Sequence, residues 1–91
     1  MNSKTIKYEN NKFKGIIHYS DEDPGYSRKK HGRGFMYFDE NGEKITANPI
    51  IERIKNIGIP PVWEDVWICP NPEGHLQATG LDARGRKQYL Y

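Results

Sequence analysis

The sequence predicts an α+β fold, in which one clear helix accompanies an antiparallel sheet of about five strands. Short runs rich in aromatic and β-branched residues alternate with turn residues along most of the chain, as in strands joined by hairpins. One segment, residues 48–57, instead repeats its isoleucines at helical spacing. The 91 residues suffice for one small domain, and its core depends on 2 Trp, 6 Tyr and 3 Phe.

The first half of the chain predicts three strands. Residues 1–12 are polar and rich in Asn and Lys, and we expect a flexible amino-terminal segment there, ahead of a domain that covers residues 13–91. A long loop with Asp-Pro-Gly is expected after the first strand, and an Asn-Gly turn after the second. The predicted elements are strand 13–19, loop 20–34, strand 35–38, turn 39–42 and returning strand 43–46.

Residues 48–57 predict the helix. Asn48 is the expected N-cap, and Pro49 suits the first helical position. Gly58 stands where a left-handed glycine commonly ends a helix, and the two prolines that follow prevent its continuation. The helix should pack on the sheet through one apolar stripe, made of Ile50, Ile51, Ile54 and Ile57.

The second half of the chain predicts three more strands. The segment WEDVWIC begins with acids and ends apolar, as a strand that enters the core would. Two clusters of Asn, Asp, Pro and Gly separate it from the segments that follow. The predicted elements are strand 63–69, turn 71–74, strand 75–79, turn 82–85 and strand 86–91.

Charge is distributed unevenly along a nearly neutral chain. With 14 Lys and Arg against 12 Asp and Glu, the formal net charge is +2. The acids cluster at 21–23 and 39–43, whereas the cations gather at 28–33 and 84–87. Two basic islands on such a protein indicate a directed surface for a polyanion rather than a general polycation.

The last segment, GLDARGRKQYLY, combines the residue types that bind duplex DNA. Arginine and lysine neutralise phosphates, glutamine can pair bidentately with an adenine edge, and tyrosine offers a ring face and a hydroxyl. Neighbouring residues of a regular strand point to opposite faces, so Gln88 and Tyr89 can both reach DNA only at an irregular strand, an edge or a groove rim. The predicted DNA-binding residues are Arg84, Arg86, Lys87, Gln88, Tyr89 and Tyr91, with a second set of Arg28, Lys29, Lys30 and Arg33.

This segment and the preceding GIPPVWEDVWICPNPEGHLQAT resemble the amino-terminal domain of bacterial and poxvirus type IB DNA topoisomerases. The resemblance is strong from Ile54 onward and weaker over residues 17–53. It implies a five-stranded antiparallel sheet with two short helices, which leaves open a second short helix here. It also implies that Gln88, Tyr89 and Tyr91 lie on a strand that faces the major groove. The positions that match Arg84, Arg86 and Lys87 are basic in the family and lie near phosphates.

The resemblance implies that the catalytic residues lie elsewhere. Family members relax supercoils without ATP, metal or another cofactor, through a tyrosine nucleophile on a larger carboxy-terminal domain. We therefore expect this chain to be a monomeric DNA-binding piece of an isomerase, with the catalytic domain following residue 91. The expected partners are double-stranded DNA and that catalytic domain. The segment by itself is not expected to be an enzyme.

Other functional interpretations of the sequence find less support in its residues. Cys69 lies in an apolar run, and no pair among Cys69, His18, His31 and His75 has the close spacing of a zinc site. Residues 33–38 begin like an RNA-binding strand of an RRM, but that fold needs two helices. A stand-alone sheet-based module for nucleic-acid binding or protein interaction is the alternative function.

The sequence also predicts a cytoplasmic protein that does not enter a membrane. Its most apolar stretch, residues 50–62, is interrupted by charges and prolines. Met1 is followed by polar residues rather than by the apolar segment of an export signal. The lone Cys69 cannot form an internal disulfide, which fits a reducing compartment such as the bacterial cytoplasm and its nucleoid.

Overall fold

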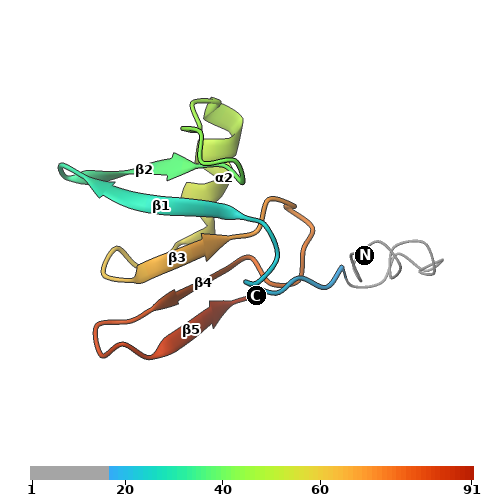
Figure 1. Cartoon of the computed structure of the whole chain (residues 1–91), viewed down its shortest axis with the longest axis vertical. Helices are drawn as coiled ribbons and strands as arrows, with labels where there is room; N and C mark the ends of the chain where they lie inside the picture. Colours follow the sequence, from blue (N-terminus) through green and yellow to red (C-terminus); the bar gives the residue numbers. More distant parts are fainter. Residues whose placement is uncertain (1–16) are drawn as a thin grey trace.

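In the computed structural model, which describes residues 17–91, five antiparallel strands form one sheet and one helix crosses it (Figure 1). The predicted α+β class with a five-stranded antiparallel sheet is confirmed. No second helix occurs within residues 17–91. The elements are β1 (Tyr26–His31), β2 (Gly34–Phe38), α2 (Asn48–Ile57), β3 (Glu64–Ile68), β4 (Ala78–Leu81) and β5 (Lys87–Leu90).

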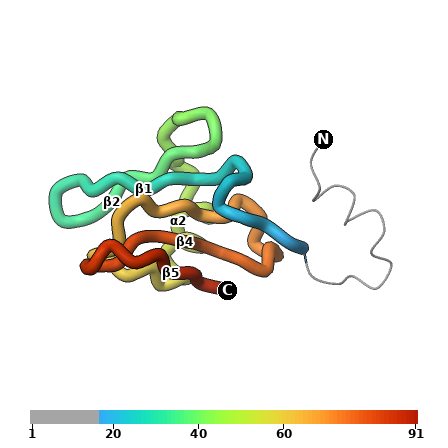
Figure 2. Tube along the Cα trace, turned by 60° about the horizontal axis from the view of Figure 1, so that its bottom comes forward, coloured from blue at the N-terminus to red at the C-terminus, as the bar shows by residue number. Residues whose placement is uncertain are grey.

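The strands are arranged in the order β2-β1-β3-β4-β5, so β2 and β5 are the two edges of the sheet. Both β1 and β4 pair antiparallel to β3, and they therefore run in the same direction. Each of them leads into a hairpin, to β2 and to β5 respectively. As a consequence, the β1–β2 and β4–β5 hairpin turns project from the same end of the sheet (Figures 1 and 2).

Helix α2 forms where the isoleucine spacing predicts it. Ile54 is almost fully buried, and Gly58 ends the helix in the left-handed region with φ 78°. The Gly58 N–H donates to the Lys55 carbonyl, as a helix-terminating glycine does. The N-cap is Ala47 rather than the predicted Asn48, and no side chain caps the first turn. Pro49 lies in the first turn of the helix, where a backbone N–H has no partner inside the helix, so the N–H that proline lacks costs no hydrogen bond.

Two apolar clusters occupy the two faces of the sheet. Between the sheet and α2, the fully or nearly buried residues are Tyr37, Ile45, Ile54, Val66 and Ile68. On the opposite face, Trp67, Cys69 and Leu76 pack with Tyr19. The loop before β1 closes over this second cluster, because the Trp67 Nε1–H donates to the Asp23 carbonyl at 2.9 Å.

The predicted loop over residues 20–34 is wrong in its second half, where strand β1 lies. Its inward positions carry Tyr26 and Arg28 instead of aliphatic residues, so the usual strand signal is missing. Arg28 places its guanidinium 4.0 Å from the Phe35 ring centre. The same group donates to the carbonyls of Pro60 (3.0 Å) and Trp63 (2.9 Å). Arginine therefore does the packing that an apolar residue performs in most strands.

Three other strand boundaries differ from expectation. The predicted returning strand 43–46 is reduced to one bridge between Phe38 and Lys44, because the chain turns away toward α2. The predicted strand 75–79 begins only at Ala78, although the Gln77 backbone still bonds Cys69 and Leu90. The Gln77 side chain donates to carbonyls of the preceding turn, including that of Gly74 at 2.6 Å. Of the predicted strand 13–19, residues 13–16 lie outside the described residues, as does the 1–12 segment, and Ile17 forms a single bridge to Gly74. The strands predicted at 35–38, 63–69 and 86–91 are confirmed within one or two residues as β2, β3 and β5.

Candidate nucleic-acid interface

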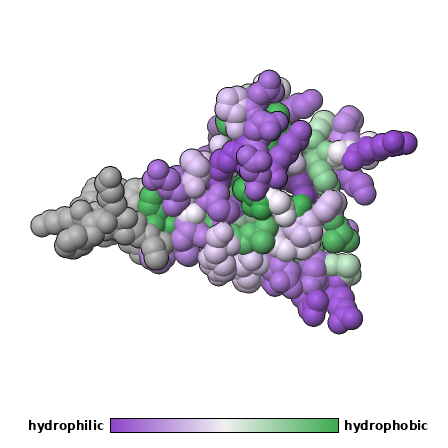
Figure 3. All heavy atoms as spheres, turned by 180° about the vertical axis from the view of Figure 1, so that it is seen from behind, coloured by the Kyte–Doolittle hydropathy of each residue, from purple (hydrophilic) through white to green (hydrophobic). Residues whose placement is uncertain are grey.

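The fold brings the two basic islands to one end of the sheet. Residues 32–33 form the β1–β2 turn and residues 82–86 the β4–β5 turn, and both turns project on the same side. In the space-filling view from behind, these two ends appear as hydrophilic projections on the right (Figure 3). Two exposed acids, Glu64 and Asp65, begin β3 between them. The surface is therefore basic at its two hairpins rather than uniformly.

Within the first island, the four cations divide between two roles. Arg28 turns toward the helix side of the sheet, and burial lowers the pKa of its guanidinium. Lys29, Lys30 and Arg33 are exposed. Of these candidates, Arg28 is thus engaged inside the domain, and the other three face solvent.

Asp82 organises the second island. Its Oδ1 accepts the backbone N–H groups of Arg84 and Arg86, both at 2.9 Å. Its Oδ2 accepts the Arg86 Nε–H at 3.0 Å and the Gln88 amide at 2.9 Å. These bonds stabilise the ionised carboxylate and so hold the pKa of Asp82 below its usual value. The bond from the Arg86 backbone N–H makes the largest contribution. One carboxylate therefore fixes the turn and two side chains of the predicted site.

Strand β5 presents different residues on its two faces. Tyr89 lies opposite Thr79, which itself lies opposite Trp67, so Tyr89 belongs to the face away from the helix. Gln88 lies opposite Gly80 and hence on the helix side. The two side chains point apart, as the strand period requires. Because β5 is the edge of the sheet, both remain accessible from outside, with Gln88 half-buried and Tyr89 49% exposed.

Two tyrosine rings continue along the end of β5. The rings of Tyr89 and Tyr91 are nearly parallel, with an interplanar angle of 18° and 6.3 Å between centroids. Tyr91 is 77% exposed, and its ring also lies 5.6 Å from that of His75. Exposed large aromatic side chains cost free energy in water unless a ligand covers them, so this row is a candidate contact surface.

Lys87 is paired across the sheet with an acid from the loop before β1. Its Nζ forms an ion pair with Asp21 Oδ2, and the Thr79 hydroxyl donates to the same oxygen at 3.4 Å. The bond from Lys87 is the main cause that lowers the pKa of Asp21. In turn, the Asp21 carboxylate raises the pKa of the Lys87 ammonium. The Lys87 side chain is nevertheless 43% exposed.

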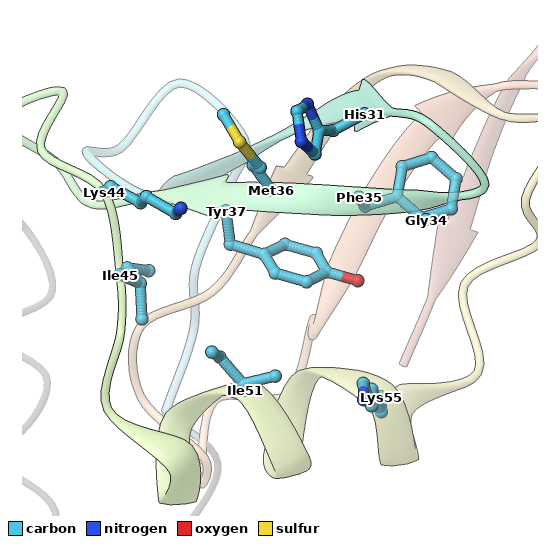
Figure 4. A pocket seen from close by; sticks show the side chains of 9 residues that line it. All are labelled: His31, Gly34, Phe35, Met36, Tyr37, Lys44, Ile45, Ile51 and Lys55. Carbon is cyan, nitrogen blue, oxygen red and sulfur yellow. The ribbon is translucent and has the colours of Figure 1, made fainter.

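A groove of about 520 Å³ opens at the other edge of the sheet, between β2 and α2 (Figure 4). The Tyr37 ring points into the space between strand and helix, above Ile51. His31, Lys44 and Lys55 also line it. Since β2 and β5 are opposite edges, this groove lies away from the tyrosine row.

Cys69, His18 and His75 make contacts within the domain. Cys69 is buried, and its thiol lies 3.4 Å from the Asn71 carbonyl. The rings of His18 and His75 meet edge to face at 4.7 Å. In the described part of the chain, no three His, Cys, Asp or Glu side chains gather where they could hold a metal ion. No helix there is long and apolar enough to span a membrane.

Asp21 and Asp82 are the two site residues that sequence reasoning missed. Asp82 was visible only as a turn residue, although its place two and four residues before Arg84 and Arg86 is the spacing at which a carboxylate caps backbone N–H groups. For Asp21 the sequence carries no signal, since its partner Lys87 is 66 residues away.

Comparison with known proteins finds one matching family and a similar viral protein. The family described as "Bacterial DNA topoisomerase IB, N-terminal domain" matches residues 34–82. The chain is 44% identical over 68 residues to the DNA topoisomerase 1B of Acanthamoeba polyphaga mimivirus. That alignment covers 74% of this chain and 20% of the relative, so the chain spans about a fifth of the relative's length. No solved structure matches the chain.

Proposed function

The chain belongs to the family of amino-terminal domains of bacterial type IB DNA topoisomerases, and from this premise we propose that it grips duplex DNA through its β4–β5 hairpin. The outer strand of this hairpin, β5, enters the major groove, and the surrounding cations contact phosphates. The family match ends at residue 82, so the role of residues 84–91 rests on their geometry and chemistry.

The observation that carries the proposal is the position of β5 at the edge of the sheet. A B-form major groove is about 12 Å wide and admits a two-stranded ribbon such as β4–β5. When an edge strand enters a groove, the side chains of both its faces meet the groove walls. Gln88 on one face and Tyr89 on the other can then contact the same duplex, which a central strand would not allow.

The cations around this edge supply phosphate contacts. Arg84 and Arg86 flank the turn, and the exposed Lys29, Lys30 and Arg33 lie on the neighbouring hairpin at the same end of the sheet. Phosphate contacts set the position and orientation of a protein on the duplex, whereas contacts to base edges select sequence. The arrangement supports a positioning role, in which this domain holds the duplex for a catalytic domain.

Strand cleavage itself belongs, in this proposal, to another domain of a longer parent chain. Cleavage needs a nucleophile together with donors that stabilise the charge of the transition state. Tyr89 and Tyr91 are surrounded by Lys87, His75 and each other rather than by a set of arginines. They are therefore assigned to DNA contact and not to attack on phosphorus.

Titration of a fluorescently labelled duplex tests the proposal. We expect weak binding, with a Kd above about 1 µM, because one domain holds only one side of the duplex. Each phosphate contact should add about 0.9 to the negative slope of log K against log salt. Tyr89→Ala should weaken binding, whereas Tyr26→Phe on the covered helix side should not. Binding that ignores both salt and Tyr89→Ala would refute the proposal.

A further inference from the structure

The chain contains two loops with the same pattern of hydrogen bonds to the backbone, and Asp82 begins the second of them. In the first loop, Asp39 Oδ1 accepts the N–H groups of Asn41 and Glu43, each at 2.9 Å. In the second, Asp82 Oδ1 accepts the N–H groups two and four residues later at the same distance. The fourth residue of each loop is a glycine in the left-handed region, with φ 81° at Gly42 and 74° at Gly85. The sequences DENGE and DARGR thus encode the same turn.

The two loops differ at the second carboxylate oxygen. Asp82 Oδ2 accepts hydrogen bonds from the Arg86 guanidinium and the Gln88 amide. For Asp39, no side chain within the described residues donates to the corresponding oxygen. The Asp82 side chain is only 15% exposed, because the side chains of its own hairpin cover it. The second oxygen of Asp82 therefore has a task beyond forming the turn.

That task follows from the chemistry of the two groups. An ionised carboxylate only accepts hydrogen bonds, so the Gln88 amide must direct its NH₂ group toward Asp82. The amide oxygen of Gln88 then points the other way, and one N–H remains unused by Asp82. This combination of one acceptor and one donor matches N6 and N7 of an adenine. With the reverse orientation, the amide would direct only donors outward.

We propose that Asp82 is a positioning residue that fixes the Gln88 amide in the orientation that reads adenine. The inference rests on the proposed DNA-binding function, and it adds the residue that determines which base edge β5 selects. Asp82 touches no DNA in this arrangement and acts through the orientation of Gln88. The bond to Arg86 holds a cation beside the same amide, where it can reach a phosphate next to the base pair.

Asp82→Asn is the informative variant because it keeps the turn and changes both contacts of the second oxygen, those to Gln88 and to Arg86. The Arg86 contact carries no base information, so only the change at Gln88 should alter base preference. The asparagine oxygen still accepts the backbone N–H groups, and its NH₂ group replaces Oδ2. This NH₂ group can bond Gln88 only if the Gln88 amide turns over and directs its own NH₂ outward. The expected preference changes from adenine toward guanine or thymine, which offer acceptors in the major groove.

The experiment selects duplexes from a pool with about 10 randomised base pairs, one helical turn, at fixed salt. Wild type should enrich adenine at one position, and Asp82→Asn should lower that enrichment about tenfold, within the range of one bidentate base contact. Asp39→Asn is the matched control, since it makes the same change in the other loop, and it should select like wild type. Asp82→Ser keeps an acceptor for the turn but supplies neither partner to Gln88, so it should lose the preference.

NMR of the free domain separates failure of this inference from failure of the proposed function. The Gln88 side-chain NH₂ signals should show slowed hydrogen exchange in wild type and in Asp39→Asn, but not in Asp82→Ser. Unprotected NH₂ signals in wild type would overturn the inference whether or not the domain binds DNA. So would identical base selection by wild type and Asp82→Asn. Protected signals in a domain that binds no duplex would instead overturn the proposed function.

Discussion

Lys87 and Asp21 form an ion pair on the face of the sheet away from α2, between strand β5 and the loop that precedes β1. The Asp21 carboxylate occupies the place beside Lys87 where a phosphate oxygen would bind. A carboxylate and a phosphate compete for the same ammonium donors, so, in the proposed function, Asp21 competes with DNA for Lys87. The Thr79 hydroxyl, on a residue only 1% exposed, helps to hold this competitor in place.

Replacing Asp21 by Asn should therefore tighten DNA binding. The change removes a negative charge beside the predicted contact surface and releases Lys87 for a phosphate, so we expect a several-fold lower Kd at low salt. Fluorescence anisotropy with a labelled duplex measures it. Glu52→Gln, which removes the same charge from the exposed side of α2, is the control and should change Kd little. If the two variants change Kd equally, the effect of Asp21→Asn comes from net charge alone and not from the release of Lys87.

The same pair should make stability depend on pH at both extremes. Because the pKa of Asp21 is lowered in the folded state, its contribution is complete above its ordinary value of 3.8 and is lost as pH falls through the lower folded value. Because the pKa of Lys87 is raised, its contribution is complete below 10.5 and is lost as pH rises through the higher folded value. Urea unfolding of wild type and Lys87→Met across pH should show a constant difference between these limits. A difference that persists at pH 2 would contradict the assignment.

Substitutions of Arg28 and Lys30 should affect folding stability and DNA binding differently, although both residues lie on the same face of β1. Arg28→Met removes the charged donor shared by the carbonyls of Pro60 and Trp63, of which Pro60 keeps the Trp63 N–H at 3.1 Å, and should cost about 1.5–3 kcal/mol of unfolding free energy. Lys30→Met removes an exposed cation and should change stability by less than about 0.5 kcal/mol. For DNA binding the order is reversed, since Lys30→Met should reduce the salt slope by about one and Arg28→Met should not. Chemical denaturation and titration at several salt concentrations measure the two quantities.

Gly80 should not tolerate a side chain. A Cβ at this position would lie 2.7 Å from Cε3 of the Trp63 ring, which packs against the core beneath α2. Overpacking of this kind typically costs about 1–3 kcal/mol, so Gly80→Ala should lower the unfolding free energy by that amount. Gly34→Ala provides the comparison, because no atom lies within 4 Å of its added Cβ. If both variants are equally stable, the contact between Trp63 and β4 is looser than described.

The 91-residue chain should not relax supercoiled plasmid at any protein concentration. Relaxation requires cleavage, and the tyrosines of β5 lack the cationic set that would stabilise a phosphorane. Separation of plasmid topoisomers on an agarose gel measures this directly. Relaxation that co-purifies with the chain and disappears in Tyr89→Phe or Tyr91→Phe would show that the chain carries its own nucleophile.

Local signals made most of the fold predictable. The isoleucine spacing and Gly58 define α2, and the turns that begin at Asp39 and Asp82 follow from their own residues, because these features depend on residues only a few positions apart. Strand β1 was missed because its inward face carries Tyr26 and Arg28. The guanidinium of Arg28 finds its partners more than thirty residues away, and periodicity cannot reveal such contacts.

For the candidate site, the residue types were predictable and their partners were not. The cations and tyrosines of residues 84–91 stand out in the sequence by composition alone. That Lys87 faces Asp21, and that Gln88 and Tyr89 straddle the edge of the sheet, depends on how distant segments pair. The assignment of the DNA-binding residues themselves stays a prediction until the titrations are made.

The position of β5 at the sheet edge also bears on self-association. An unpaired edge strand can recruit a strand from another copy of the same protein, and exposed aromatic residues increase that hazard. At the other edge, the chain protects β2 itself, since the Ile45 N–H donates to the Tyr37 carbonyl. Within residues 17–91, strand β5 has no such cover, and its short length of four residues limits strand pairing with another copy. In the proposed function, an edge strand that is left open for DNA is thus also left open to other copies of the domain while the duplex is absent.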